Sequence, residues 1–379
     1  MPAIPSSAET AAVRFWAGDT PRAGSARPRG ASYSVLALSG GGPDGAYGAG
    51  LLAGLGAAGA RPDFDVVTGV STGALMAPFV FLGPSQDEVL RELYTGPDVE
   101  TLLEGGLLAL LDQPGLYRHR EIRVRIERYV TADLLAAIAA EHRRGRRLYV
   151  ATGSLDAQRK AVWDMGAIAA RGTAHDLILF REVLTAAMSI PLLFPPVALP
   201  ATDAASFASE LHGDASLFAG FYAGTELFPE PGPRGCGSAA LRCRLYVLVH
   251  NKLLPEPELL PLHVGSISAR AVQSMVKANL TLALNATYQA MRSAGIQFGA
   301  ARLRTQAPGV SPIHFERSYM QRIYAEGFAH GSQPDVWRDL TGLFRPDPPV
   351  EPEQPAWEVA QVATERRPES GHPRAPLDR

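Results

Sequence analysis

A serine within a glycine turn is the residue whose surroundings best suit covalent chemistry. Residues 69–73 (GVSTG) match the G-x-S-x-G pattern, in which Gly69 and Gly73 leave room for a sharp strand-to-helix turn that exposes the hydroxyl of Ser71. A neutral hydroxyl is a poor nucleophile, so it needs a base within hydrogen-bond reach. The pattern predicts that Ser71 is a nucleophile if the chain also supplies that base.

A second glycine cluster lies upstream of this serine. Gly40, Gly41 and Gly42 follow the apolar run 33–38 (YSVLAL). Acyl transfer needs backbone N–H donors aimed at the oxyanion of its tetrahedral intermediate. Glycines allow a ligand to approach the backbone, and the positive end of the next helix favours negative charge. We therefore expect this loop to form an oxyanion hole.

Alternating apolar runs must position both loops. Runs 33–38 and 64–69 are typical of buried strands, and runs 46–58 and 74–81 are typical of the helices that follow them. This βαβα order predicts a parallel sheet, which brings both loops to one edge. Further strands are expected at 147–152, 161–165 and 245–250, and further helices at 176–187 and 268–292.

Residues 36–50 (LALSGGGPDGAYGAG), followed by the serine turn, closely resemble the glycine-rich loop and nucleophile elbow of patatin-like phospholipases. Segments 155–165 and 187–196 extend the resemblance, which covers roughly residues 34–217. It implies a three-layer α/β fold with a central, mainly parallel sheet flanked by helices. It also implies a serine lipid acyl hydrolase that uses a Ser–Asp dyad and acts on lipid, possibly at a membrane surface.

Two residues depart from the family pattern. The family places its catalytic aspartate in a D-G-G or D-G-A motif, and the matching residue here is Asp214, within 212–216 (HGDAS). The resemblance implies that Asp214 is the base, although Ala215 stands where a glycine is expected. In the loop, Asp44 replaces the usual Arg or Lys of G-G-G-x-R/K-G. Either backbone amides alone stabilise the oxyanion, or the chain is an impaired scaffold that binds lipid or a protein partner.

The glycine loop also permits a dinucleotide-binding interpretation. Gly40, Gly42 and Gly45 match G-x-G-x-x-G, and Asp63 and Asp65 lie about 20 residues further on. In a Rossmann unit, however, the ribose-binding acid follows the second strand. Both aspartates precede or begin the apolar part of that strand here, so their position disfavours a nucleotide.

A Ser–His–Asp triad is the other alternative. His212, His250 and His263 all follow Ser71, as the chain order of α/β-hydrolases requires. Those enzymes usually have several strands before the serine turn, whereas Ser71 lies only 29 positions after Gly42. We therefore rank the triad second.

Charge and apolar patterning limit the possible partners. The formal net charge of −2 gives no global attraction to nucleic acid or to an anionic membrane. Apolar stretches 102–111 and 190–197 could accept an acyl chain, although ordinary core is at least as good an interpretation. The basic run 143–147 (RRGRR) could meet phosphate head groups, but such runs are more often solvated.

The remaining sequence features concern organisation. We expect an irregular segment at 1–30, a catalytic domain with a C-terminal helical extension at 31–344, and a disordered Pro-rich and charged tail at 345–379. Neither an export signal nor a membrane-spanning run is visible, so a cytoplasmic protein is expected, with export or membrane association possible if the N-terminus is trimmed. Cys236 and Cys243 could pair, and we expect no metal or cofactor.

Overall fold

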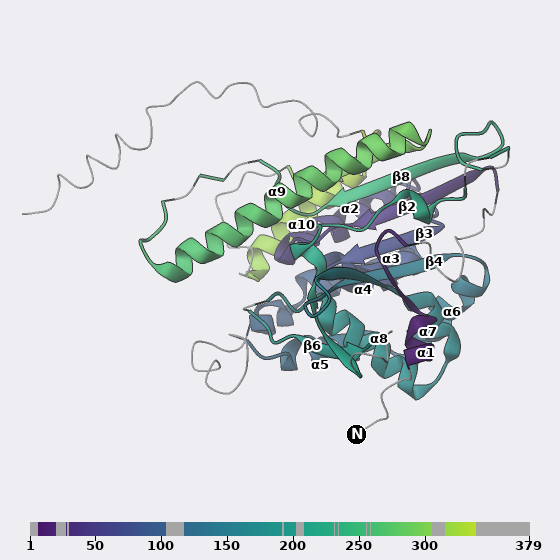
Figure 1. Ribbon diagram of the computed structural model, residues 1–379. Helices are drawn as coiled ribbons and strands as arrows, with labels where there is room; N and C mark the ends of the chain where they lie inside the picture. The colour runs from purple at the N-terminus through teal and green to yellow at the C-terminus, as the bar shows by residue number, and fades with distance from the viewer. Residues whose placement is uncertain are drawn as a thin grey trace, which may run out of the picture. The chain divides into compact units, whose positions relative to one another are not determined.

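A nine-stranded mixed sheet forms the centre of the part of the chain described by the computed structural model (Figure 1). That part comprises residues 7–19, 28, 30–103, 117–191, 193–201, 208–230, 232–233, 235–254, 256–257, 259–304 and 315–338. The strands are β1 (Arg14–Trp16), β2 (Ser32–Leu38), β3 (Val66–Val70), β4 (Arg147–Ser154), β5 (Arg159–Asp164), β6 (Val197–Pro200), β7 (Ser209–Asp214), β8 (Arg242–Val249) and β9 (Gln297–Arg302). The helices are α1 (Ser7–Ala11), α2 (Gly45–Ala57), α3 (Thr72–Leu82), α4 (Asp87–Thr95), α5 (Arg120–Tyr129), α6 (Ala132–Arg143), α7 (Met165–Arg171), α8 (Ala174–Ala187), α9 (Val264–Ser293) and α10 (Arg317–Gly331).

The strand order is β1-β5-β4-β3-β2-β8-β9, with β7 pairing to both β4 and β6. Strands β4, β3, β2, β8 and β9 are parallel neighbours, whereas β1, β5, β6 and β7 pair in antiparallel fashion. The predicted α/β fold with a mainly parallel sheet is therefore confirmed. Every strand and helix predicted from an apolar run also has its counterpart among these elements.

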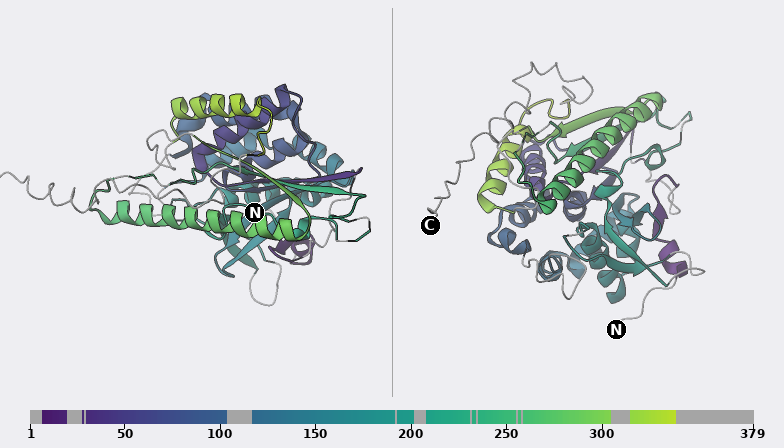
Figure 2. Two further views of the ribbon diagram at one scale, coloured as in Figure 1. Left: turned by 90° about the horizontal axis from the view of Figure 1, so that it is seen from above. Right: turned by 60° about the vertical axis from the view of Figure 1, so that its left-hand side comes forward.

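Helical layers cover the two faces of the sheet. Leu36 and Leu38 of β2 belong to the main core, into which α2 and α3 pack. On the opposite face, α9 buries Leu280 and Leu284, and the segment that follows β7 lies there too, since Thr68 donates a hydrogen bond to the Tyr222 carbonyl (2.5 Å). The left view of Figure 2 shows α9 on one side of the strands and α10 on the other.

Helices α2 and α10 approach each other through glycines. A Cβ added at Gly50 would overlap the Tyr324 carbonyl oxygen, and one added at Gly327 would overlap the Tyr47 carbonyl oxygen. Gly54 and Gly331 make the same kind of backbone contact one helical turn further on. Only glycine allows two helix backbones to come this close.

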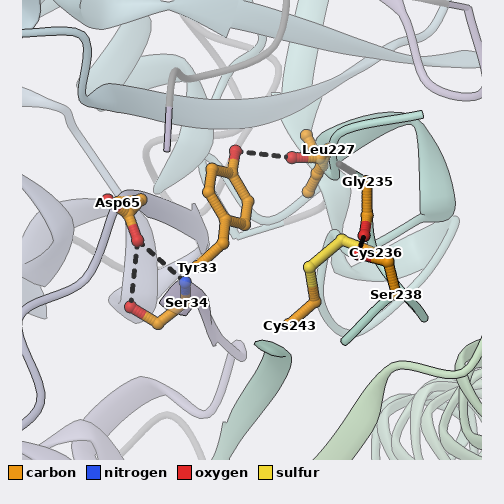
Figure 3. Close-up of a disulfide and its surroundings, with 8 residues drawn as sticks. All are labelled: Tyr33, Ser34, Asp65, Leu227, Gly235, Cys236, Ser238 and Cys243. Atoms are coloured by element: carbon orange, nitrogen blue, oxygen red, sulfur yellow. Dashed lines mark hydrogen bonds between the residues drawn. A yellow bond between two sulfur atoms is a disulfide. The ribbon is translucent and has the colours of Figure 1, made fainter. Parts of the chain in front are cut away.

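A disulfide joins Cys236 to Cys243, with their Cα atoms 5.4 Å apart (Figure 3). The pairing that the sequence left open is therefore formed. Cys243 pairs in register with Tyr33, at the start of β8 and β2. The bridge consequently lies at the amino end of these strands, opposite the glycine loop that follows β2.

The N-terminal segment adds a strand to the sheet. Strand β1 lies within the segment 1–30 and pairs with β5 through Arg14, Phe15 and Trp16. The tail 345–379 lies outside the described residues, and so do residues 1–6 and 20–27. None of the helices described is long and apolar enough to cross a membrane.

Candidate active site

The serine turn joins β3 directly to α3. Ser71 has a φ of +53°, which few residues other than glycine adopt, and α3 begins at the next residue. A Cβ at Gly73 would lie 2.6 Å from the Leu38 carbonyl oxygen, and one at Gly69 would lie 2.6 Å from Ala74 Cα. Both glycines are therefore required by close backbone contacts, and the strained conformation of Ser71 is held by its surroundings.

Ser71 is more enclosed than the sequence pattern suggested. We expected an exposed hydroxyl, but the residue is only 3% exposed. The reason is the glycine loop, because a Cβ placed on Gly40 would lie 3.2 Å from Ser71 Cβ. A substrate must therefore reach a serine that lies beneath this loop.

Strand β4 brings Ser71 and Asp214 together. Parallel β3 pairs with β4 as far as Val70, which lies opposite Ala151. Antiparallel β7 pairs with the remainder of β4 and ends at Asp214, opposite Thr152. The ends of β3 and β7 thus meet on consecutive residues of β4, which places the serine beside the aspartate.

Asp214 is almost fully buried, and its carboxylate is only partly satisfied. Burial raises its pKa above the usual aspartate range, while interactions with Ser71 and Ser216 act in the opposite direction. Oδ1 accepts a hydrogen bond from the Ser216 amide at 2.8 Å, whereas Oδ2 has no hydrogen-bond partner among the described residues. Ser71 is near enough to lower this pKa, although its hydroxyl does not meet strict hydrogen-bond geometry with the carboxylate.

Supporting residues that sequence reasoning missed hold the Asp214 segment. The Asp214 amide donates to the Ser189 carbonyl at 2.8 Å. The Ser189 hydroxyl donates to the Thr185 carbonyl and accepts from His119 Nε2, at 2.7 and 2.8 Å. Only the Ser216 contact had a local signal, since Asp-x-Ser favours an Asx-type turn.

The glycine loop presents two amides rather than three. We expected Gly40, Gly41 and Gly42 all to donate to an oxyanion, but the Gly40 amide donates to the Gly220 carbonyl at 2.9 Å. Gly41 and Gly42 are partly exposed, and their amides have no hydrogen-bond acceptor within the described ranges. Of the three predicted oxyanion donors, the Gly40 amide is thus already bonded, and the roles of the Gly41 and Gly42 amides stay a prediction.

His250 supports this loop from behind. Its Nδ1 donates to the Ser39 carbonyl at 2.6 Å, and its amide donates to the Ser39 hydroxyl at 2.9 Å. Because the Ser39 carbonyl and the Gly40 amide share one planar peptide, these bonds fix the direction of both. Burial lowers the His250 pKa to about 4, so the ring is neutral at pH 7.

Comparison with known proteins identifies the family of one part of the chain. A family model described as patatin-like phospholipase matches residues 36–215. Residues 36–215 form a patatin-like phospholipase domain. The domain thus belongs to a family of lipid acyl hydrolases, and it contains both Ser71 and Asp214.

Two solved structures show weak overall similarity. VipD from Legionella pneumophila is 12% identical with a TM-score of 0.36, over 83% of this chain and 69% of that chain. The type III effector protein ExoU is 16% identical with a TM-score of 0.32, over 81% of this chain and 54% of that chain. No curated protein sequence matches the chain. Because both TM-scores are below 0.5, these two similarities support no conclusion beyond the family match over residues 36–215.

The two departures from the patatin pattern are accommodated differently. Ala215 is buried at the start of a short 3₁₀ helix, Ala215–Leu217, and its φ is not positive, so the position does not require glycine. Asp44 accepts a hydrogen bond from the Tyr319 hydroxyl at 2.6 Å. Burial raises the Asp44 pKa to about 6, although Tyr319 and the nearby Lys252 act in the opposite direction.

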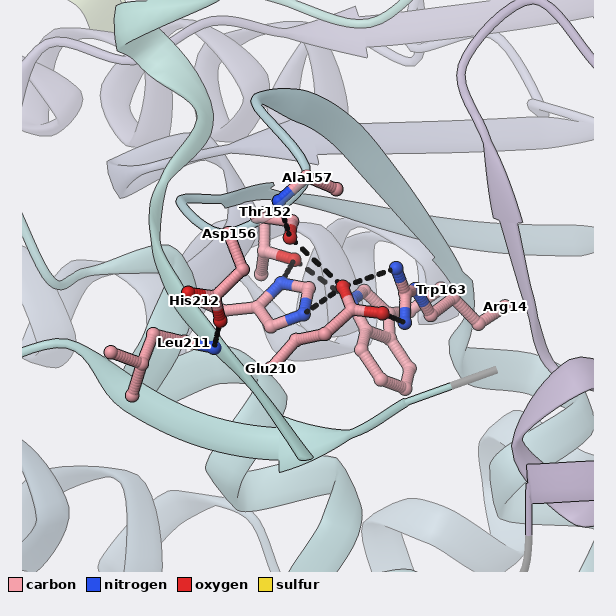
Figure 4. Close-up of polar contacts among 9 residues, drawn as sticks. Arg14, Thr152, Asp156, Ala157, Trp163, Glu210, Leu211 and His212 are labelled. Atoms are coloured by element: carbon pink, nitrogen blue, oxygen red, sulfur yellow. Dashed lines mark hydrogen bonds and ion pairs between the residues drawn. The ribbon is translucent and has the colours of Figure 1, made fainter. Parts of the chain in front are cut away.

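The histidines proposed for a triad make their described contacts with residues other than Ser71. His212 is buried and hydrogen-bonds through Nδ1 to Thr152 Oγ1 at 2.8 Å, within a polar cluster that includes Arg14 and Glu210 (Figure 4). His263 is exposed. No histidine hydrogen-bonds to the Ser71 side chain among the described residues.

Asp65 and Arg146, which the sequence suggested as ligand-binding residues, lie far from Ser71. Asp65 accepts a hydrogen bond from the Ser34 amide at 2.8 Å, at the amino end of β2 and β3 (Figure 3). A ribose on the glycine loop would lie at the other end of these strands. Arg146, from the basic run, donates to the Phe64 carbonyl at 2.8 Å and is also at the amino end. Neither group faces Ser71.

Apolar side chains do border the Asp214 side of the patatin-like domain. A Cβ on Gly213 would lie 3.4 Å from Pro191 Cγ. Phe194 is buried and stacks on His119 with a centroid separation of 5.9 Å. Pro191 thus lies beside the site and Phe194 belongs to the core, whereas most of the segment 102–111 is outside the described residues.

Proposed function

We propose that this protein is a serine lipid acyl hydrolase that cleaves carboxylic esters through a Ser71–Asp214 dyad and an acyl-enzyme. The observation that carries the proposal is the meeting of β3 and β7 on β4, where Val70 lies opposite Ala151 and Asp214 lies opposite Thr152. It supports a direct serine–aspartate pair. The family of residues 36–215 supports a lipid ester as substrate.

In the acylation step, Asp214 Oδ2 takes the proton from Ser71 Oγ as Oγ attacks the ester carbonyl carbon. The carbonyl oxygen becomes an oxyanion, which accepts hydrogen bonds from the Gly41 and Gly42 amides. The intermediate collapses, the bond to the leaving alcohol breaks, and Asp214 returns the proton to that alcohol. Burial favours this role because it raises the Asp214 pKa and makes the carboxylate a stronger base.

In the deacylation step, Asp214 takes a proton from water, whose oxygen attacks the acyl carbon on Ser71. The same two amides hold the second oxyanion. The bond to Ser71 Oγ breaks, the serine recovers its proton, and a fatty acid leaves. The apolar side chain of Pro191, which lies against Gly213 next to Asp214, suits an acyl chain better than a polar substituent.

Labelling with a fluorophosphonate probe tests the nucleophile. We expect the wild type to be labelled and Ser71→Ala to remain unlabelled. Ser318→Ala, at an exposed serine on α10, is the control and should label normally. Turnover of a short soluble p-nitrophenyl ester should follow the same order.

Other results would point to the alternatives. A folded wild type that neither labels nor hydrolyses any ester would contradict the enzyme and favour the impaired, lipid-binding scaffold. Labelling that persists in Ser71→Ala would assign the nucleophile to another residue. For an enzyme that is labelled at Ser71, assays of fatty-acid release from phospholipid and triacylglycerol would identify the lipid class.

A further inference from the structure

Helix α9 has apolar side chains on two opposite faces. Leu280, Leu284 and Met291 are buried on its inner face. At about 100° per residue, Val264, Met275 and Leu282 lie within about 20° of one another on the outer face, and Ile267 lies one turn from Val264. These outer side chains are between 48% and 80% exposed. One face therefore packs on the protein, and the other has no cover within the described chain.

Two further exposed leucines precede the helix in the chain. Leu259 and Leu262 are 93% and 99% exposed, more than any other large apolar side chain described. We call these two leucines, with Val264, Ile267, Met275 and Leu282, the apolar face. Single exposed apolar residues are normal on proteins, but six within the 24 positions 259–282, four of them on α9, are not.

Polar contacts hold this segment in place. Lys277 donates to the Leu254 carbonyl at 2.7 Å and to Glu256 Oε2 at 2.9 Å. Lys252 pairs with the other carboxylate oxygen of Glu256 at 3.1 Å, and Arg270 donates to the Glu256 carbonyl. These bonds link Leu254 and Glu256, which precede the two leucines, to Arg270 and Lys277 in the helix that follows them.

Helix α9 and the chain that leads to it contact the glycine loop and its support at two points. Strand β8 ends at Val249, and His250 then supports the Ser39–Gly41 turn. In the middle of α9, Leu280 lies against Gly220, whose carbonyl accepts the Gly40 amide. From Leu280 to Val264 is 16 residues, or about 24 Å of helix. Figures 1 and 2 show this first half of α9 extending beyond the strands.

We infer that the apolar face docks the protein onto a lipid surface, an inference that rests on the proposed function. The scissile ester must reach a serine that is 3% exposed, so the substrate must leave its lipid phase close to the site. The face consists of Leu, Val, Ile and Met, without the Trp, Tyr and Arg side chains that dominate contacts between proteins. An apolar helix face of this kind inserts into the boundary between head groups and acyl chains.

Charge contributes little to this docking. Residues 250–284 contain three cations, Lys252, Arg270 and Lys277, against Glu256 and Glu258, a net charge of +1. Lys252 and Lys277 are already paired with Glu256. We therefore expect binding to phosphatidylcholine vesicles that needs no anionic lipid and survives high salt.

Flotation with phosphatidylcholine vesicles tests the inference, using Ser71→Ala protein so that no lipid is consumed. This protein should float with the vesicles at low and high salt. Adding Leu262→Asp and Met275→Asp should weaken binding about 100-fold, because burial of each apolar side chain contributes about tenfold. Adding Val124→Asp and Ile178→Asp instead, at exposed positions on α5 and α8, is the matched control and should not alter binding.

Three outcomes would overturn the inference. The first is that the Ser71→Ala protein fails to float, and the second is that the Leu262→Asp, Met275→Asp protein floats equally well. The third is that light scattering shows a dimer dissociated by those substitutions, which would assign the face to contact between copies. Failure of the proposed function is recognised separately, because a protein that floats but is not labelled by the fluorophosphonate docks on lipid without hydrolysing it.

Discussion

The Tyr319 hydroxyl donates a hydrogen bond to Asp44 Oδ1 at 2.6 Å. Tyr319 lies on α10, outside residues 36–215, whereas Asp44 ends the glycine loop. A helix beyond the patatin-like domain therefore encloses the acid that replaces the usual basic residue. Enclosure raises the Asp44 pKa to about 6 and links this residue to stability.

Asp44→Asn should stabilise the protein at pH 8 but not at pH 4. The folded-state pKa of about 6 lies above the ordinary aspartate value of 3.8, so folding favours the protonated acid. The protonated Asp44 therefore contributes fully to the free energy of unfolding below pH 4. This contribution is lost as the pH rises to 6 and above. Urea unfolding should show a gain of up to about 3 kcal/mol at pH 8.

Two comparisons check the Asp44 prediction. Asp63→Asn, at an exposed position, controls for the general loss of a carboxylate. Tyr319→Phe removes a hydrogen bond that lowers the Asp44 pKa, so it should cost more stability at pH 8 than at pH 4. An equal effect of Asp44→Asn at both pH values would contradict the assignment of this pKa.

Asp214→Asn should lower kcat about 10² to 10⁴-fold with little change in KM, because it removes the base but not the binding surface. In the wild type, kcat should fall as the pH drops through the Asp214 pKa, which burial raises above the usual range. The variant should lack this acidic limb. A pH profile of ester hydrolysis checks both points, and an unchanged limb in the variant would assign it to another group.

Gly40→Ala should reduce kcat about 10- to 100-fold while the protein stays folded, because small displacements of reacting groups are costly. The added methyl group would lie 3.2 Å from Ser71 Cβ, which forces the loop and the serine apart. Gly30→Ala is the matched control, since nothing lies within 4 Å of its added Cβ. Full activity in Gly40→Ala would show that the loop does not confine the nucleophile.

His212→Ala should lower stability but leave hydrolysis largely intact. The ring lies between Thr152 and Glu210 in the buried cluster, so its loss should cost about 1–3 kcal/mol in unsatisfied polar groups. The kcat of the folded variant should change only a few-fold, whereas loss of a triad histidine would cost about 10⁶-fold. Circular dichroism and ester turnover measured together distinguish the two cases.

Gly327→Ala should destabilise the protein by about 1–3 kcal/mol, although alanine favours helix more than glycine does. Its methyl group would overlap the Tyr47 carbonyl oxygen and push α10 from α2. Ala325→Ser, on the exposed side of the same helix, adds an atom without that overlap and serves as control. Urea unfolding measures both, and equal stability would mean that α10 can shift without cost.

The sequence predicted the local features better than the distant ones. The strand, glycine turn and helix around Ser71 follow from apolar runs and glycine spacing, and the structure has them. Asp214 came from family resemblance alone, because its place depends on pairing between β7 and β4. The Gly40–Gly220 bond and the enclosure of Ser71 are tertiary contacts that no local pattern indicates.

The end-to-end meeting of β3 and β7 has a consequence for folding. Ser71 and Asp214 are far apart in sequence, and contacts between such distant segments form late because they close long loops. A partly folded chain can present its serine turn before β7 has docked, but it then lacks the carboxylate. Under the proposed dyad mechanism, hydrolysis would therefore begin only once β7 has paired with β4.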